Sequence, residues 1–273
     1  MSLAFQVPST IGGRLLELLR YRDLVVQLTI RDLKLKYKRS TIGIAWSFLN
    51  PVLMMAIYTV VFSIFLRVVN LHNYWALVLG GVLAWSFFTN SMISATTVFV
   101  RNPSVITKVY FPLEAMPIAI VLGHFVNFLI TLAILLVVLA VAGIPLGPSL
   151  VLLPLIVAAT LAFTIGLALL AATLTVHFRD VEHFVTIGLS AVFYLTPVIY
   201  PLDAALIPAG KRFLPFLRLN PLSWYLESYH SVLYYGTWPD PLLFGLMLAS
   251  SVLFLAGGYW IFHRLRPRLP EEL

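Results

Sequence analysis

Residues 115–178 read AMPIAIVLGHFVNFLITLAILLVVLAVAGIPLGPSLVLLPLIVAATLAFTIGLALLAATLTVHF and contain no Asp, Glu, Lys or Arg. A helix that crosses the hydrocarbon core of a bilayer needs about 20 mostly apolar residues, so this stretch is long enough for two crossings. The glycines and prolines of GIPLGP at 143–148 divide it, because such a cluster is typical of a tight turn. The stretch therefore predicts two adjacent transmembrane helices, at 115–142 and 149–178.

The rest of the chain has the same apolar character. It is 60% hydrophobic and only 11% charged, with a mean hydropathy of +0.96, whereas soluble domains average about 25% charged residues. Four further stretches without Asp, Glu, Lys or Arg predict spans at 40–66, 74–100, 183–202 and 241–263. The sequence thus predicts an all-α integral membrane protein with six transmembrane helices in one transmembrane domain, 40–263.

The basic residues predict the orientation of these spans. An even number of spans places the N-terminal segment 1–39 and the C-terminal tail 264–273 on the same side. Fourteen of the 18 Lys and Arg residues then fall on that side and four on the other. Because loops rich in Lys and Arg stay in the cytoplasm, we expect both termini to be cytoplasmic.

Two segments outside the spans have distinctive patterns. In 1–39, Leu24, Leu28 and Leu35 fall near one side of a helix that also carries a basic row, which predicts an amphipathic helix on the inner membrane face. This helix either anchors the chain to acidic lipids or binds a partner. In 203–240, Asn220 can cap a helix that Gly236 ends. We interpret 203–240 as a re-entrant outer region with helices that dip into the membrane and return.

The sequence lacks the residues of several function classes. The spans contain no interior Asp, Glu, Lys or Arg, so the usual equipment of proton- or sodium-coupled transport is missing. No Gly-x-x-x-x-Gly-Lys-Ser/Thr phosphate-binding loop occurs, so the chain has no ATPase site of that kind. It has no cysteine and no zinc-binding motif, and we predict no catalytic residue, no metal site and no cofactor in this chain.

Aromatic residues are the main positive signal. Flat rings stack on the apolar faces of sugars without fixing one pattern of hydroxyls, which suits a sliding polymer. Ordinary helix packing and an interfacial aromatic belt are the alternative explanations. The aromatic candidates for a substrate channel are Trp46, Tyr58, Phe62, Phe65, Trp85, Phe88, Tyr194 and Tyr200, and those for an outer gate region are Trp224, Tyr225 and Tyr229.

Several motifs resemble one known family along nearly the whole chain. The N-terminal stretch RDLKLKYKRSTIG at 31–43 is followed by Trp46 and by LNP at 49–51. Further motifs are RNP at 101–103, KVYFP at 108–112, FRDV at 178–181, TPVIYP at 196–201 and Asn220-Pro221. In this order they resemble the permease subunits of bacterial ABC exporters for O-antigen, capsule or teichoic acid.

The resemblance implies a location in the bacterial inner membrane, a mechanism and its partners. Two copies of the chain would pair with two copies of a separate ATPase that holds ATP and Mg²⁺, and a lipid-linked polysaccharide would pass between the two permeases. The first and fifth spans would line the channel. The residues that would couple to the ATPase are Arg31, Lys34, Arg101, Asn102, Lys108, Arg179 and Asp180.

The cargo remains open at this point. The Arg-Asp-Leu-Lys stretch and the Arg-Asn-Pro loop look closest to the O-antigen branch, with teichoic acid or capsule as alternatives on the same fold. An exporter of drugs or small lipids would keep the fold and change the cargo. A membrane enzyme acting on polyprenyl-linked sugars is a further alternative, and the lack of suitable acidic residues counts against it.

Overall fold

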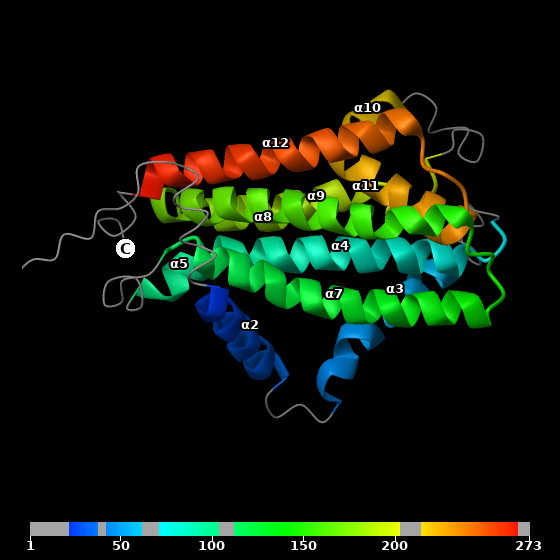
Figure 1. Cartoon of the computed structure of the whole chain (residues 1–273), viewed down its shortest axis with the longest axis horizontal. Helices are drawn as coiled ribbons and strands as arrows, with labels where there is room; N and C mark the ends of the chain where they lie inside the picture. The colour runs from blue at the N-terminus through cyan, green and yellow to red at the C-terminus, as the bar shows by residue number, and fades with distance from the viewer. Residues whose placement is uncertain (1–21, 38–41, 62–70, 104–111, 203–213, 267–273) are drawn as a thin grey trace, which may run out of the picture.

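Among the residues that the structure describes, four helices are long and apolar enough to cross a membrane, and they run side by side in the computed structural model (Figure 1). The structure describes residues 22–37, 42–61, 71–103, 112–202 and 214–266, and all regular secondary structure within these ranges is helical. The four helices are α4 (Tyr74–Thr96), α7 (Ala115–Val141), α8 (Leu153–His177) and α12 (Pro241–Leu265). At 1.5 Å per residue each is about 35–40 Å long, enough for a hydrocarbon core of about 30 Å.

The first and fifth predicted spans contain shorter helices. α3 covers Trp46–Thr59, and the end of the first predicted span, residues 62–66, lies outside the described residues. α9 covers Val181–Tyr194, about 21 Å at the usual helical rise, so this helix alone is too short to cross the membrane. Pro197 and Pro201 lack the N–H that a helix needs, and residues 195–202 continue as a non-helical stretch that is buried from Thr196 to Ile199.

The buried stretch after α9 packs against α4. The Tyr74 hydroxyl donates a hydrogen bond to the carbonyl oxygen of Ile199. A Cβ on Gly81 would lie 2.2 Å from the carbonyl oxygen of Val198, so only glycine allows this approach. Backbone of this kind is tolerated at membrane depth where protein covers it. The predicted fifth span therefore consists of a helix followed by an irregular, protein-covered segment.

The two ends of the bundle differ in composition. The first, here called the basic end, carries α5 (Val98–Arg101), the turn between α8 and α9, and the last residues of α12. The second, the tyrosine end, carries α10 (Leu214–Leu219), α11 (Pro221–His230) and the π-helical turn η5 (Ser231–Tyr235). Figure 1 shows them at opposite ends of the long helices.

α11 begins as the sequence predicts and lies inside the bundle. The Asn220 side chain accepts a hydrogen bond from the backbone N–H of Leu222, and Pro221 occupies the first turn. Gly236, at φ 64°, ends the segment after η5. The predicted cap and stop of this segment are thus confirmed, and its buried tyrosines join the main hydrophobic core with residues of α4, α7 and α8.

The turn between α7 and α8 also forms where the sequence predicts it. Gly143 has φ 73°, in the left-handed region that favours glycine. The 3₁₀ turn η3 (Pro148–Leu152) then leads into α8. A Cβ on Gly147 would lie 2.0 Å from the carbonyl oxygen of Gly236, so the α7–α8 turn and the end of η5 meet through two glycines.

A second, smaller core lies at the basic end. It joins Phe99, Met116 and Phe262, from α5, α7 and α12, to Val25 of α2 (Arg22–Tyr37). The Thr29 hydroxyl lies 3.2 Å from the carbonyl oxygen of Ala119, so α2 packs on the first half of α7. Leu28 is half-buried against this core, while the side chains of Leu24 and Leu35 lie outside the described residues.

Candidate functional site

Two pockets flank α3, and each lies between α3, α4 and a third helix. We call them the α9 pocket, with a volume of about 370 Å³, and the α7 pocket, of about 290 Å³. The residues that distinguish the α9 pocket include Met54, Tyr58, Trp85, Thr186, Ser190 and Tyr194. The residues that distinguish the α7 pocket include Trp46, Phe87, His124, Asn127, Phe128 and Thr131.

The α9 pocket brings together three of the predicted channel residues. Tyr58, Trp85 and Tyr194 come from α3, α4 and α9, and all three line it. Phe193 joins them, because its ring centroid lies 5.7 Å from Tyr58, 5.6 Å from Trp85 and 5.1 Å from Tyr194. Tyr194 is 66% exposed, so an aromatic surface remains open at the edge of the pocket.

The other predicted channel residues lie in different places. Trp46 lines the α7 pocket. Phe88 is buried in the main core, with its ring centroid 5.9 Å from that of Phe163, and it lines neither of the two pockets. Tyr200 donates a hydrogen bond of 2.9 Å to the carbonyl oxygen of Tyr194. Phe62 and Phe65 lie outside the described residues.

Neutral polar side chains line both pockets, and the sequence analysis did not select them. Asn50, Ser86 and Asn90 border the two pockets together. Ser86 and Asn90 are four residues apart on α4, and three polar residues of α7, His124, Asn127 and Thr131, follow at spacings of three and four. Such spacings place side chains on one helix face. This repeat of uncharged polar residues within two spans is the signal that would have identified them.

The predicted outer-gate residues anchor α11 to its neighbours. The Tyr225 hydroxyl lies 3.1 Å from the carbonyl oxygen of Met247 and 3.0 Å from the Ser250 hydroxyl. The Tyr229 hydroxyl lies 3.1 Å from that of Thr160 on α8. Both tyrosines are buried. Trp224 is half-buried and donates from its indole nitrogen to the carbonyl oxygen of Arg218, at 2.7 Å.

The basic end collects several of the predicted coupling residues. Arg101 ends α5 and lies 3.9 Å from Glu182, in the first turn of α9, so the two predicted inner loops meet. Asn102 donates from its side chain to the carbonyl oxygen of Val98, at 2.9 Å. Arg31, Arg179 and Asp180 are exposed. Lys108 and the side chain of Lys34 lie outside the described residues.

A buried ion pair also lies at the basic end. Glu114, just before α7, is 2% exposed, and its carboxylate lies 3.5 Å from the guanidinium of Arg266 at the end of α12. An unpaired buried carboxylate would be strongly destabilising. The pair therefore fixes the end of α12 against the start of α7.

The described residues contain no group of three or more His, Cys, Asp or Glu side chains that could hold a metal ion. Both pockets are lined only by uncharged residues, with His124 as the one titratable imidazole among them and two tyrosine hydroxyls in the α9 pocket. Such a lining can stack on apolar surfaces and exchange hydrogen bonds with neutral groups.

Comparison with known proteins finds one matching family and several similar chains. Residues 23–234 match the family described as ABC-2 type transporter. The chain is 32% identical over 257 residues to the O-antigen export system permease protein RfbA of Myxococcus xanthus, covering 94% of this chain and 98% of that protein. It is also 32% identical over 252 residues to the protein of the same name from Klebsiella pneumoniae, covering 92% and 95% of the two chains.

Proposed function

The chain belongs to the ABC-2 type transporter family, and we propose that it is the permease subunit of an ATP-driven exporter that moves lipid-linked O-antigen across the bacterial inner membrane. The observation that carries this proposal is the end-to-end similarity to O-antigen export permeases, which extends over more than nine-tenths of this chain. The chain is thus a transport subunit, and the ATPase of such a system is a separate polypeptide.

The α9 pocket supports a path for a sugar polymer. It combines aromatic rings with the hydroxyls of Thr186 and Ser190 and the amides of Asn50 and Asn90. Rings offer a flat surface to the apolar face of a sugar, and the polar groups donate and accept hydrogen bonds at its hydroxyls. A lining without fixed charges lets successive units pass without being held at one position.

We place this path between two copies of the chain. α9 has no buried residue among those described. Its exposed Phe184, Ile187 and Tyr194 share one face, because they follow each other at spacings of three and seven residues. If lipid tails packed against this face, the polar groups that line the neighbouring α9 pocket would gain no hydrogen-bond partners. A second copy packed near α9 would instead close the pocket into a channel.

The basic end is our candidate for the contact with the ATPase. The excess of Lys and Arg on the side of the termini favours a cytoplasmic location for this end. Arg101 and Glu182 bring the two inner loops together there, and Arg179 and Asp180 lie exposed beside α9. ATP and Mg²⁺ would be bound by the partner ATPase, which the permease contacts through this surface.

Other cargoes on the same fold are less well supported. The names of the relatives favour O-antigen over teichoic acid or capsule. An enzyme that acts on polyprenyl-linked sugars would need acidic or basic groups near its substrate, and acidic residues are absent from both pockets. The region of Trp224, Tyr225 and Tyr229 remains our candidate for a gate on the far side, with the two buried tyrosines as its structural support.

Substitutions of Tyr58 and Tyr194 test the proposed path. In a strain that lacks the native gene, Phe at either position keeps the stacking surface and should leave surface polysaccharide near the wild-type level. Ala should lower it several-fold while lipid-linked polymer accumulates inside. Export is expressed per folded permease, measured from a detergent-stable peak, so that loss of protein is separated from loss of transport.

Two outcomes would count against the proposal. If both Ala variants fold and export normally, the polymer does not pass along the α9 pocket. If deletion of the gene leaves surface O-antigen unchanged and depletes another polymer, the assigned cargo is wrong while the transport role stands.

A further inference from the structure

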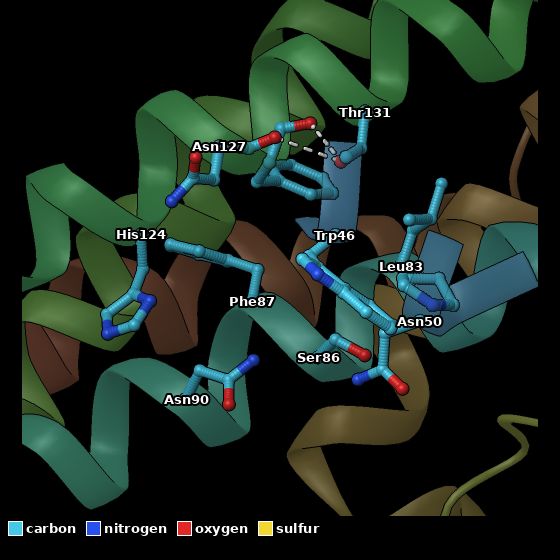
Figure 2. A pocket seen from close by; sticks show the side chains of 11 residues that line it. Trp46, Asn50, Leu83, Ser86, Phe87, Asn90, His124, Asn127 and Thr131 are labelled. Atoms are coloured by element: carbon cyan, nitrogen blue, oxygen red, sulfur yellow. Dashed lines mark hydrogen bonds between the residues drawn. The ribbon is translucent and has the colours of Figure 1, made fainter. Parts of the chain in front are cut away.

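The α7 pocket is a polar chamber at membrane depth on the other side of α3 (Figure 2). Asn90 lies six residues before the end of α4, and His124 lies nine residues after the start of α7. At the usual helical rise these positions are about 9 and 14 Å from the helix ends at the basic end. The lining continues to Leu83 and Thr131, beyond the midpoints of α4 and α7, so the chamber lies around the middle of the bundle.

The lining of this pocket defines the ligand chemistry that it fits. Its polar members are Asn50, Ser86, Asn90, His124, Asn127 and Thr131. None of the lining residues is Asp, Glu, Lys or Arg, so a phosphate or carboxylate would find no counter-charge. A ligand must therefore be neutral and must both donate and accept hydrogen bonds.

Part of this hydrogen-bonding capacity is unused within the protein. Thr131 bonds to the carbonyl oxygens of Asn127 and Phe128, and the His124 ring lies 3.1 Å from the Ser94 hydroxyl. Within the described residues, in contrast, the side-chain amides of Asn50 and Asn90 make no hydrogen bond, and both residues are exposed. Exposed amides at this depth are costly against lipid tails, so the pocket favours a polar occupant.

The pocket also offers an apolar surface and a connection to the α9 pocket. Trp46, which is 45% exposed, lines the pocket together with the buried Phe87 and Phe128. Asn50, Ser86 and Asn90 line both pockets, so the polar surface continues beneath α3 from one side to the other. A pyranose ring carries an apolar face and a rim of neutral hydroxyls, which matches this combination.

We propose that the α7 pocket is a second binding site for a neutral sugar unit of the transported glycolipid, separate from the α9 pocket. This inference rests on the proposed function, because it takes the sugar from the exporter's own cargo. The site would hold a sugar on the side of α3 away from α9, while the shared asparagines contact units on both sides.

Thiol protection tests this site, because the chain contains no cysteine. Single variants His124→Cys, Asn127→Cys and Trp46→Cys are assembled with the ATPase in lipid nanodiscs, and reaction with a small water-soluble thiol reagent is timed. The probes are a long isoprenyl phosphate that carries a neutral hexasaccharide and the same isoprenyl phosphate without sugar. Three positions on two helices keep the test open if one variant does not fold.

The expected result is protection by the sugar. Labelling at the three positions should slow roughly tenfold when the glycolipid is present at about ten times its Kd, since protection scales with the occupied fraction, and the sugar-free carrier should have no effect. Val126→Cys, on α7 and 38% exposed but outside the pocket, is the matched control and should label at an unchanged rate.

Two results would overturn the inference. Equal protection by the sugar-free carrier would show that the pocket binds the lipid, and unprotected labelling at all three positions would show a chamber that holds only water. Ser190→Cys in the α9 pocket separates these failures from failure of the proposed function. If Ser190→Cys is protected and the α7 positions are not, only this inference fails. If none of the positions is protected, the proposed path fails as well.

Discussion

At the scale of single residues, burial decides which polar side chains are available to a substrate. The hydroxyls of Tyr225 and Tyr229 are used inside the protein to hold α11, whereas Tyr194 presents its ring at an open pocket. Residue type alone did not distinguish these tyrosines, since all three occur in apolar surroundings. The asparagines of the two pockets were missed for a related reason, because charges within a span are a strong signal of function, whereas neutral amides there also occur in ordinary helix packing.

His230 provides a residue-scale prediction about pH. It is fully buried on α11, outside the predicted spans, and burial lowers the pKa of His230 to about 4, an effect partly offset by the backbone of Leu77. The unfolded chain would take up the proton near pH 6.5. The stabilising contribution of neutral His230 is therefore complete above pH 6.5 and is lost as the pH falls towards 4.

Thermal or SDS-induced unfolding of the purified protein measures this effect. When the pH falls from 7.5 to 5, protonation of His230 in the unfolded chain should lower the free energy of unfolding by about 2 kcal/mol. The variant His230→Gln cannot take up this proton, so its free energy of unfolding should fall by correspondingly less over the same pH range. An identical pH dependence in both proteins would show that His230 does not titrate differently in the folded state.

At the scale of helices, small residues allow close contact between neighbouring backbones. Prolines influence where a helix ends. The sequence predicts the four long helices because their charge-free stretches are far longer than a soluble helix requires. It did not predict the end of α9 at Tyr194, since apolar residues continue beyond it and the prediction followed hydropathy. Pro197 and Pro201 indicate in the sequence that the helix ends before them. The contact of Val198 with Gly81 then explains why the irregular segment is stable.

The crossing of α8 and α12 gives an element-scale prediction. A Cβ on Gly258 would lie 2.0 Å from the carbonyl oxygen of Gly166, which is backbone and cannot move aside cheaply. Gly258→Ala should therefore lower the stability of the folded protein by about 1–3 kcal/mol, as overpacking does in other close-packed interiors. Gly257→Ala is the matched control, because a Cβ there meets nothing within 4 Å. Equal melting temperatures for the two variants would refute this account of the crossing.

A second prediction at this scale concerns Arg101 and Glu182. Their ion pair is exposed, so breaking it should cost at most about 1 kcal/mol. If Arg101 docks on the ATPase, Arg101→Glu should uncouple ATP hydrolysis from export while the protein remains folded. The charge swap Arg101→Glu with Glu182→Arg rebuilds the pair and should not restore export. Full recovery in the swap would assign Arg101 to joining the two loops and not to docking.

At the scale of the whole molecule, the chain belongs to the ABC-2 type transporter family and is a transport subunit, and our proposal adds a second copy beside α9. Among the described residues, four helices have spanning length, while α3 and α9, which line the α9 pocket, are shorter. Sequence alone predicted the membrane class and the family, because composition and ordered motifs carry both. It did not predict the two pockets, because they form between helices far apart in the chain.

The most direct test of ATP-driven polysaccharide export is translocation with purified components. The permease and its ATPase are reconstituted in liposomes whose outer leaflet contains labelled lipid-linked O-antigen, and the polymer that becomes inaccessible to an external glycosidase is measured. The account predicts protection that requires ATP hydrolysis, disappears without the permease, and falls in the Tyr194→Ala variant. ATP hydrolysis at a normal rate with no protected polymer, or protection that proceeds equally without ATP, would contradict it.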